Sequence, residues 1–257
     1  MRTHWVGRKM RKPYERHEIV YKRMKKKGVR SWNESQRVKR KAIDADTKQF
    51  LTDVLAQLCC PKGGKVIELG CGTGPILRWI CKGDFSGLGV DVSKTAIAMA
   101  KEQSKGLNIR FKRADICSTD VERAGKFDLA VDGHCLHCII RPEDRKAFLK
   151  NSFKLLKKGG LFIVMTMCSP ADRKIFSNLY KEQKLINHTI YAPYDKAGEY
   201  EDFLTFDGRD YMPTRKVPHW KSILSEIRRT GFKIKLLRYN EASGQEPFGC
   251  LSVAAMA

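Results

Sequence analysis

From Lys65 onward, short apolar runs alternate with segments whose apolar residues recur at helical spacing. This alternation is typical of an α/β fold built on a parallel sheet. A strand that is apolar at nearly every position, as at 161–167, predicts a central parallel strand covered on both faces. The pattern predicts strands at 65–69, 85–92, 109–114, 127–131 and 161–167, and helices at 43–58, 75–82, 94–105 and 142–157.

The end of the chain continues the sheet with a different connection. A helix is expected at 219–230, followed by two apolar runs, 233–239 and 248–255, joined by a turn that contains Gly244. Because so short a connection cannot make a parallel crossover, the two runs are expected to form an antiparallel hairpin. The fold class predicted is therefore α/β, with a doubly wound, seven-stranded, mostly parallel sheet that ends in this hairpin.

Two segments depart from the alternation, and they define the expected domain organisation. In residues 1–42, Val20 and Met24 have the spacing of a short amphipathic helix. Residues 168–218 show no clean period, and a run this long inside a compact domain is typical of a functional lid. We predict a basic N-terminal cap over 1–42 and a main domain over 43–257, with 168–218 as a lid or substrate insertion.

Charge is distributed unevenly along the chain. The 257 residues include 50 Lys and Arg against 28 Asp and Glu, a formal net charge of +22. Residues 1–41 alone hold 16 basic and three acidic residues. A basic arm on a basic body is the electrostatic footprint of a polyanion binder, although a solvated lysine-rich helix face has the same composition. RNA therefore stays open as a partner of the N-terminal arm.

Composition also narrows the class of protein. The hydrophobic fraction of 42% suits a globular chain, and the apolar run 161–165 is far shorter than a membrane-spanning helix. Nine cysteines, an odd number, are spread along a chain too large to need disulfides, and no apolar leader begins it. The arm is basic and acid-poor like a mitochondrial transit peptide, but it is rich in Lys and poor in Ser. We expect reduced thiols and a cytoplasmic location.

The strongest chemical signal is a glycine-rich turn, ELGCGTG at 68–74, between a predicted strand and a predicted helix. Glycines let the backbone turn tightly and let a ligand approach it closely. Asp91 ends the next strand, where a carboxylate can accept hydrogen bonds from ribose hydroxyls. The spacing G-x-G-x-G followed by Pro75 departs from the dinucleotide pattern G-x-G-x-x-G. The turn therefore disfavours NAD and favours a different adenosyl ligand.

Five segments in order resemble the motifs of class I S-adenosylmethionine (SAM)-dependent methyltransferases, from about residue 43 to the end of the chain. They are VIELGCGTG at 66–74, GVDVS at 89–93, RADI at 113–116, FDLAVD at 127–132 and LLKKGG at 155–160. The resemblance implies a Rossmann-like fold with SAM as cofactor, Asp91 on the ribose, and Asp115 and Ile116 at the adenine. The cofactor contacts it implies are Glu68, Gly70, Cys71, Gly72, Gly74, Asp91, Val92, Asp115, Ile116 and Asp132.

The segment DGHCLHC at 132–138 follows the fourth strand, at the place where the family positions residues beside the transferred methyl group. Two His and two Cys suggest zinc, but this spacing hardly allows four tetrahedral ligands, so we expect no metal. Cys135 and Cys138 are expected to be small buried hydrophobes. His134 and His137 are the candidate catalytic residues, because either can accept a proton from a hydroxyl nucleophile. The alternative is a histidine that is satisfied by the neighbouring helix.

The methyl acceptor is less constrained. RNA methyltransferases that act on base nitrogens often carry Asn/Asp-Pro-Pro-aromatic after the fourth strand, where this chain has DGHC at 132–135. Together with the insertion after the fifth strand, this favours methyl transfer by in-line displacement to O, N or S of a small molecule. An RNA methyltransferase is the alternative, and a non-catalytic SAM-fold protein that binds RNA or a partner is the third hypothesis. The candidate acceptor contacts are Tyr21, Trp32, Tyr191 and Tyr194, with Tyr14 and Tyr211 as further pocket aromatics.

Overall fold

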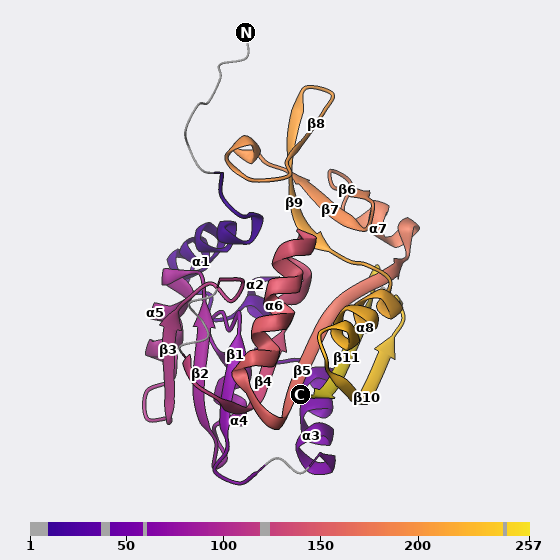
Figure 1. Ribbon diagram of the computed structural model, residues 1–257. Helices are drawn as coiled ribbons and strands as arrows, with labels where there is room; N and C mark the ends of the chain where they lie inside the picture. Colours follow the sequence, from indigo (N-terminus) through magenta and orange to yellow (C-terminus); the bar gives the residue numbers. More distant parts are fainter. Residues whose placement is uncertain (1–9, 37–41, 59–60, 119–123, 244–245) are drawn as a thin grey trace.

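A seven-stranded sheet forms the centre of the computed structural model, which describes residues 10–36, 42–58, 61–118, 124–243 and 246–257 (Figure 1). The strand order is β10-β11-β5-β4-β1-β2-β3. The first five strands along the chain are parallel, and β11 lies antiparallel between β5 and β10, which confirms the predicted fold class and hairpin. Part of the turn before β11, including Gly244, lies outside the described residues. The strands are β1 (Lys65–Leu69), β2 (Ser86–Asp91), β3 (Ile109–Arg113), β4 (Phe127–Gly133), β5 (Leu156–Ala171), β10 (Lys233–Asn240) and β11 (Phe248–Met256).

The central strand β5 divides the core into two layers, one on each face of the sheet. Its residues from Leu161 to Met165 are at most 4% exposed. Because successive side chains on a strand point to opposite faces, Phe162 and Val164 join one apolar cluster, while Leu161, Ile163 and Met165 join the other. This double burial is the physical reason why the run is apolar at every one of these positions.

Helices cover both faces of the sheet, as expected for a doubly wound fold. Helices α6 and α8 supply apolar residues to the layer that contains Phe162, and helices α3, α4 and α5 supply the layer that contains Ile163. Two of them begin at the polar caps that their sequences provide: Asp44 accepts from the Thr47 N–H, and Ser93 accepts from the Ala96 N–H. The helices are α3 (Ala45–Gln57), α4 (Pro75–Ile80), α5 (Lys94–Gln103), α6 (Pro142–Leu155) and α8 (Trp220–Arg229). In the described part of the chain, no helix has the length and apolar character needed to cross a membrane.

The predicted insertion contains regular structure that its sequence does not reveal. A second, antiparallel sheet in the order β6-β7-β9-β8 lies beyond the carboxyl ends of the parallel strands (Figure 1). Three of its strands have only three to five residues, so they are too short to show the alternation by which strands are recognised. Its elements are α7 (Arg173–Leu179), β6 (Lys184–Ile186), β7 (Thr189–Pro193), η4 (Ala197–Glu199), β8 (Leu204–Phe206) and β9 (Arg209–Lys216).

The N-terminal segment forms η1 (Pro13–Arg16), α1 (His17–Lys26) and α2 (Trp32–Gln36), and α1 is the amphipathic helix that the sequence predicts. Residues 1–9 and 37–41 of the predicted arm lie outside the described residues. Helix α1 buries Tyr21 and Met24 in one cluster with Ala96 of α5. Upstream, the Arg11 N–H donates to the Glu199 carbonyl at 3.0 Å, so the same segment also contacts the insertion.

Glu18 attaches α1 to the beginning of α5. Its carboxylate accepts hydrogen bonds from the Ser93 hydroxyl at 2.7 Å, the Thr95 hydroxyl at 2.7 Å and the Thr95 N–H at 3.1 Å. The positive end of the α5 dipole favours a negative charge at this position. The N-terminal segment is therefore docked by a charged hydrogen-bond cluster as well as by its apolar face.

We predict that Glu18→Ala loosens the N-terminal segment without unfolding the domain. Hydrogen bonds to a charged group contribute about 1.5–3 kcal/mol, so amides in α1 should lose roughly one to two orders of magnitude of hydrogen-exchange protection while β5 keeps its own. Lys22→Ala is the matched control, because Lys22 makes only an exposed ion pair with Glu18 at 3.6 Å. Equal α1 protection in the wild type and Glu18→Ala would contradict this docking role.

Candidate active site

A cavity of about 610 Å³ opens at the carboxyl ends of the parallel strands. It lies where the strand order reverses between β1 and β4, the place at which doubly wound folds bind ligands. Its volume falls within the range of roughly 300–1,000 Å³ that is usual for small-molecule sites. The loops that follow the central strands, the N-terminal segment, and strands β7 and β9 of the insertion line it, together with residues at the start of α3, after α7 and at the beginning of β11.

The glycine loop after β1 forms one wall of the cavity. Gly70 and Gly72 have φ angles of +66° and +53°, in the left-handed region where other residues are strained. A Cβ at Gly70 would collide with Cys135, and one at Gly72 would collide with the Tyr21 hydroxyl, so the close packing also requires glycine. The Thr73 hydroxyl of this loop is buried and has no hydrogen-bond partner among the described residues. A ligand in the cavity would satisfy it.

Two aspartates hold the loops around this wall. Asp91 accepts from the Gly72 N–H at 2.9 Å and from the Ser93 N–H at 2.8 Å, and burial raises its pKa to about 6. Asp115 accepts from the Cys117 N–H at 2.9 Å and from the Tyr14 hydroxyl at 3.0 Å. Each carboxylate oxygen accepts one of these bonds and keeps a further lone pair for a ligand.

Glu68 and Asp132 are also buried carboxyl groups, but only Glu68 lines the cavity. Glu68 accepts from the Leu77 N–H at 3.0 Å, and burial raises its pKa to about 8. Asp132 is 0% exposed and accepts from the N–H groups of Cys135 and Leu136, while burial raises its pKa to about 7. Asp132 therefore shapes the turn that carries the histidines instead of facing a ligand.

The structure brings eight of the ten predicted cofactor residues to the cavity wall. Gly74 joins Asp132 outside this lining, because it is the residue that precedes α4 and its φ angle of +73° sets the start of that helix. The eight lining residues are Glu68, Gly70, Cys71, Gly72, Asp91, Val92, Asp115 and Ile116.

His134 and His137 have different hydrogen-bonding roles. The Nδ1 atom of His137 accepts from the Met167 N–H at 3.3 Å, so its proton lies on Nε2, and burial holds its pKa well below the usual value. His137 is thus a neutral donor without a spare lone pair. The ring of His134 has no hydrogen-bond partner in the described residues, and burial also lowers its pKa. Of the two predicted catalytic residues, His134 is the one arranged to accept a proton.

His17 is a third histidine on the cavity wall, and the sequence interpretation did not include it. Its Nδ1 atom lies 2.9 Å from the Tyr14 carbonyl oxygen and donates to it, which leaves an unprotonated Nε2. Burial, followed by the positive charge of Arg215, lowers the pKa of His17 to about 4. Its position four residues before Tyr21 on the buried face of α1 is the one sequence signal that would have indicated it.

The cysteines of the same turn behave as apolar side chains. Cys135 packs against one of the two core layers, and burial raises the pKa of both Cys135 and Cys138 above the usual thiol value. Both are therefore protonated thiols at neutral pH. Over the described ranges, no three His, Cys, Asp or Glu side chains are placed to hold a metal ion.

Some of the aromatic residues predicted to contact the acceptor line the cavity, and others do not. Tyr21 and Trp32 line the cavity, as does Tyr14, whereas Tyr191, Tyr194 and Tyr211 are absent from the lining. On β7 it is Ile190 and Ala192 that face the cavity, so the alternation of the strand turns Tyr191 away. Tyr194 lies behind the wall, with its ring 4.8 Å from the Arg16 guanidinium.

Comparison with known proteins agrees with the motif interpretation. Residues 66–160 match the family model of the methyltransferase domain. Carboxy-S-adenosyl-L-methionine synthase of Campylobacter jejuni is 26% identical over 178 residues, which cover 67% of this chain and 71% of that protein. The protein of the same name from Campylobacter concisus is 29% identical, over 68% of this chain and 71% of that protein.

Solved structures show the same fold. A SAM-dependent methyltransferase of Methanosarcina mazei superposes with a TM-score of 0.60 at 21% identity, over 79% of this chain and 96% of that one. The 1,6-didemethyltoxoflavin-N1-methyltransferase of Burkholderia thailandensis, solved with 1,6-didemethyltoxoflavin and S-adenosylhomocysteine, gives 0.58 at 17% identity. That match covers 98% of this chain and 92% of the other.

The residues on the wall fit SAM. The cofactor carries a positive sulfonium and a positive ammonium group, and the buried carboxyls of Glu68 and Asp91 form no ion pair with any described residue. A bound cation would relieve the cost of burying their negative charge. The unpartnered Thr73 hydroxyl and the glycine loop without side chains supply the remaining polar and close contacts.

We predict that SAM affinity rises with pH. The free protein keeps a proton on Asp91 up to about pH 6 and on Glu68 up to about pH 8, and a bound cation favours their ionised forms. The Kd should therefore fall between about pH 5.5 and 7.5, by up to about tenfold per pH unit for each proton displaced. Calorimetry in two buffers of different ionisation enthalpy measures both the Kd and the protons released.

The raised pKa values of Asp91 and Glu68 also determine how the stability of the protein depends on pH. Raised carboxyl pKa values stabilise the cofactor-free protein most at low pH, and this contribution is lost as the pH rises through about 6 and about 8. The gain in melting temperature on adding SAM should therefore be larger near pH 7.5 than near pH 5.5. A Kd that is independent of pH, with no proton release, would contradict this account.

We also predict that Asp91→Asn weakens SAM binding by about 10- to 100-fold, because it removes the charge of a hydrogen-bonding group and keeps its size. Asp53→Asn is the control, since Asp53 lies on α3, pairs with Arg238 at 2.7 Å and does not line the cavity. Calorimetric titration of both folded variants tests the difference. Unchanged affinity in Asp91→Asn would remove Asp91 from the binding site.

Proposed function

We propose that this chain, a SAM-dependent methyltransferase of class I, transfers the methyl group to an oxygen, nitrogen or sulfur atom of a small-molecule acceptor. The observation that carries the proposal is the enclosure of the cavity. The N-terminal segment and the insertion both line it, and they contact each other through Arg11, whose carbonyl accepts from the Glu201 N–H at 2.9 Å. A site covered from both sides suits an acceptor that is small enough to be enclosed completely.

The chemistry needs few groups from the protein. Bound SAM supplies a methyl group that its sulfonium already activates, so placement of the acceptor and exclusion of water provide most of the remaining rate enhancement. Tyr14 donates to Asp115 and the Tyr21 hydroxyl packs against Gly72, so both side chains would help to exclude water from the reacting groups. His134 would accept the proton from a hydroxyl or ammonium acceptor, because its ring has a lone pair that no described residue occupies.

The position of the basic residues supports a small acceptor over RNA. Lys25, Lys26 and Lys27 belong to the basic arm that leaves RNA open as a partner. They are exposed at the end of α1, and none of them lines the cavity. The apolar face of the same helix instead buries Tyr21 and Met24. Covering the cavity therefore accounts for the apolar face of α1 without a contact to phosphate.

A second candidate function follows from the relatives. Carboxy-S-adenosyl-L-methionine synthase is named for a product in which SAM itself is modified, and its Campylobacter forms match two thirds of this chain. In that case the chain would convert the cofactor instead of donating its methyl group. The two functions differ in their nucleoside product, which is S-adenosylhomocysteine for methyl transfer and carboxy-SAM for the alternative.

We predict S-adenosylhomocysteine as the nucleoside product, together with a methylated small molecule. The purified protein is incubated with methyl-labelled SAM and a cell extract, with and without RNase, and the products are separated by size and identified by mass spectrometry. Label should appear in a methylated small molecule other than SAM or carboxy-SAM, whether or not RNase is present. Label in RNA that RNase releases as methylated nucleotides, or carboxy-SAM as the product, would overturn the proposal.

Charge reversal at the lysine cluster is the matched control for this experiment. Lys25→Glu, Lys26→Glu and Lys27→Glu together should leave the rate of label transfer within about twofold, with little dependence on salt. An RNA acceptor would require a steep fall in affinity with log salt that flattens in the charge-reversed protein.

A further inference from the structure

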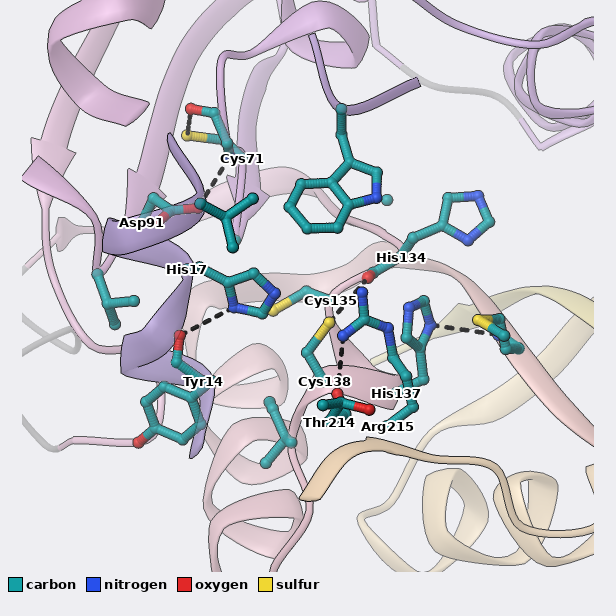
Figure 2. Close-up of a pocket in the computed structure, with 18 of the residues that line it drawn as sticks. Tyr14, His17, Cys71, Asp91, His134, Cys135, His137, Cys138, Thr214 and Arg215 are labelled. Carbon is teal, nitrogen blue, oxygen red and sulfur yellow. Dashed lines mark hydrogen bonds between the residues drawn. The ribbon is translucent and has the colours of Figure 1, made fainter. Parts of the chain in front are cut away.

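Arg215 is a cation on the cavity wall without a carboxylate to neutralise it. It lies on β9, donates to the Thr214 carbonyl at 2.7 Å, and has its guanidinium 5.7 Å from the ring of Trp32. No acidic side chain pairs with it among the described residues. Figure 2 shows the guanidinium between His17 and His137, and its charge lowers the pKa of both rings.

Arg16 is the second basic residue on the same wall. Its guanidinium rests on the Tyr194 ring at 4.8 Å and has no acidic partner in the described ranges either. Burial lowers its pKa, and the charge of Arg215 contributes in the same direction. Two arginines whose positive charges repel each other therefore line one cavity.

The neighbouring basic residues differ from Arg215 and Arg16, because each of them forms an ion pair. Lys12 lies 3.0 Å from Asp144, Arg141 lies 2.8 Å from Glu201, and Arg145 lies 2.7 Å from Glu226. All three are half-buried or buried, and none of them lines the cavity. Among the described residues, these three basic side chains near the site have counterions, whereas Arg215 and Arg16 on the cavity wall have none.

The charges of the cavity are separated along its length. Glu68, Asp91 and Asp115 surround the glycine loop, where the cationic cofactor fits. Of the two other acids on the wall, Asp44 caps α3 through Thr47, and Glu246 is exposed. The end formed by β9, His17 and His137 carries Arg215 and uncharged imidazoles, whereas the Asp44 carboxylate acts on His134 and opposes the lowering of its pKa.

We propose that the acceptor carries a carboxylate, which Arg215 binds while the methyl-accepting atom points toward the glycine loop. The planar guanidinium fork matches a carboxylate with two parallel hydrogen bonds, and the Nε2–H of His137 adds a donor at the same end. Binding an anion here would offset the repulsion between the charges of Arg215 and Arg16. Arg215 is then a specificity-determining residue of the transfer reaction, an inference that rests on the proposed function.

Arg215→Gln tests this role, and Arg209→Gln is the matched control. Both arginines lie on β9, but Arg209 is exposed and pairs with Glu182 at 3.3 Å on the surface. The small molecules of a cell extract are separated by anion exchange into carboxylate-bearing and uncharged fractions. Each fraction is incubated with methyl-labelled SAM and with the wild type or either variant, and a portion of the acidic fraction is first esterified.

We expect transfer in the carboxylate fraction, its loss on esterification, and a fall in kcat/KM of about 10- to 100-fold for Arg215→Gln. Arg209→Gln should stay within about twofold, and the Kd for SAM should be the same in all three proteins. Arg215→Lys should restore part of the activity, because it returns the charge without the fork.

Two different failures can be told apart. Transfer to uncharged molecules, or an Arg215→Gln variant as active as the wild type on the acidic fraction, would overturn the carboxylate site and leave the proposed function intact. If no fraction yielded a methylated small molecule other than SAM, the proposed function would be overturned and this inference with it.

Discussion

The Asp91 carboxylate is the interaction on which the rest of the site depends. One oxygen fixes the glycine loop through Gly72, and the other fixes Ser93 at the start of α5. Ser93 in turn donates to Glu18, which anchors α1. Because α1 carries Tyr21 over Gly72, the chain of contacts returns to the loop where it begins. A single buried acid thus connects the cofactor wall to the segment that covers it, and its raised pKa is the electrostatic consequence of that burial.

Burial also determines the protonation states of the titratable groups in the site. It favours the uncharged form of Glu68, of the cavity histidines and of the thiols Cys135 and Cys138. Such a wall is arranged to receive charge from outside: a cation at the glycine loop and an anion at Arg215. The electrostatic asymmetry of the cavity is therefore a property of the empty protein.

Most of the fold and half of the site could be predicted from the sequence, for different reasons. Strand β5 is recognisable because both of its faces are buried, and the glycine loop because only glycine tolerates its backbone. The insertion sheet was missed since β6 and β8 have three residues each, too few to show a period. The cofactor half follows local motifs, whereas the acceptor half depends on which face of β7 and β9 meets the cavity. The orientation of these strands directs Tyr191 away from the cavity and Arg215 toward it, and no local sequence pattern predicts this orientation.

The N-terminal segment and the insertion both cover the cavity, and this arrangement has a kinetic consequence. Tyr14 is bonded to Asp115 and Glu18 to α5, while Arg11 joins this segment to Glu199 of the insertion. Release of spent cofactor past these segments would require these bonds to open, and opening of such segments occurs in microseconds to milliseconds or more slowly. Nucleoside exchange by this route would take place in discrete openings, whose frequency would set an upper limit on turnover.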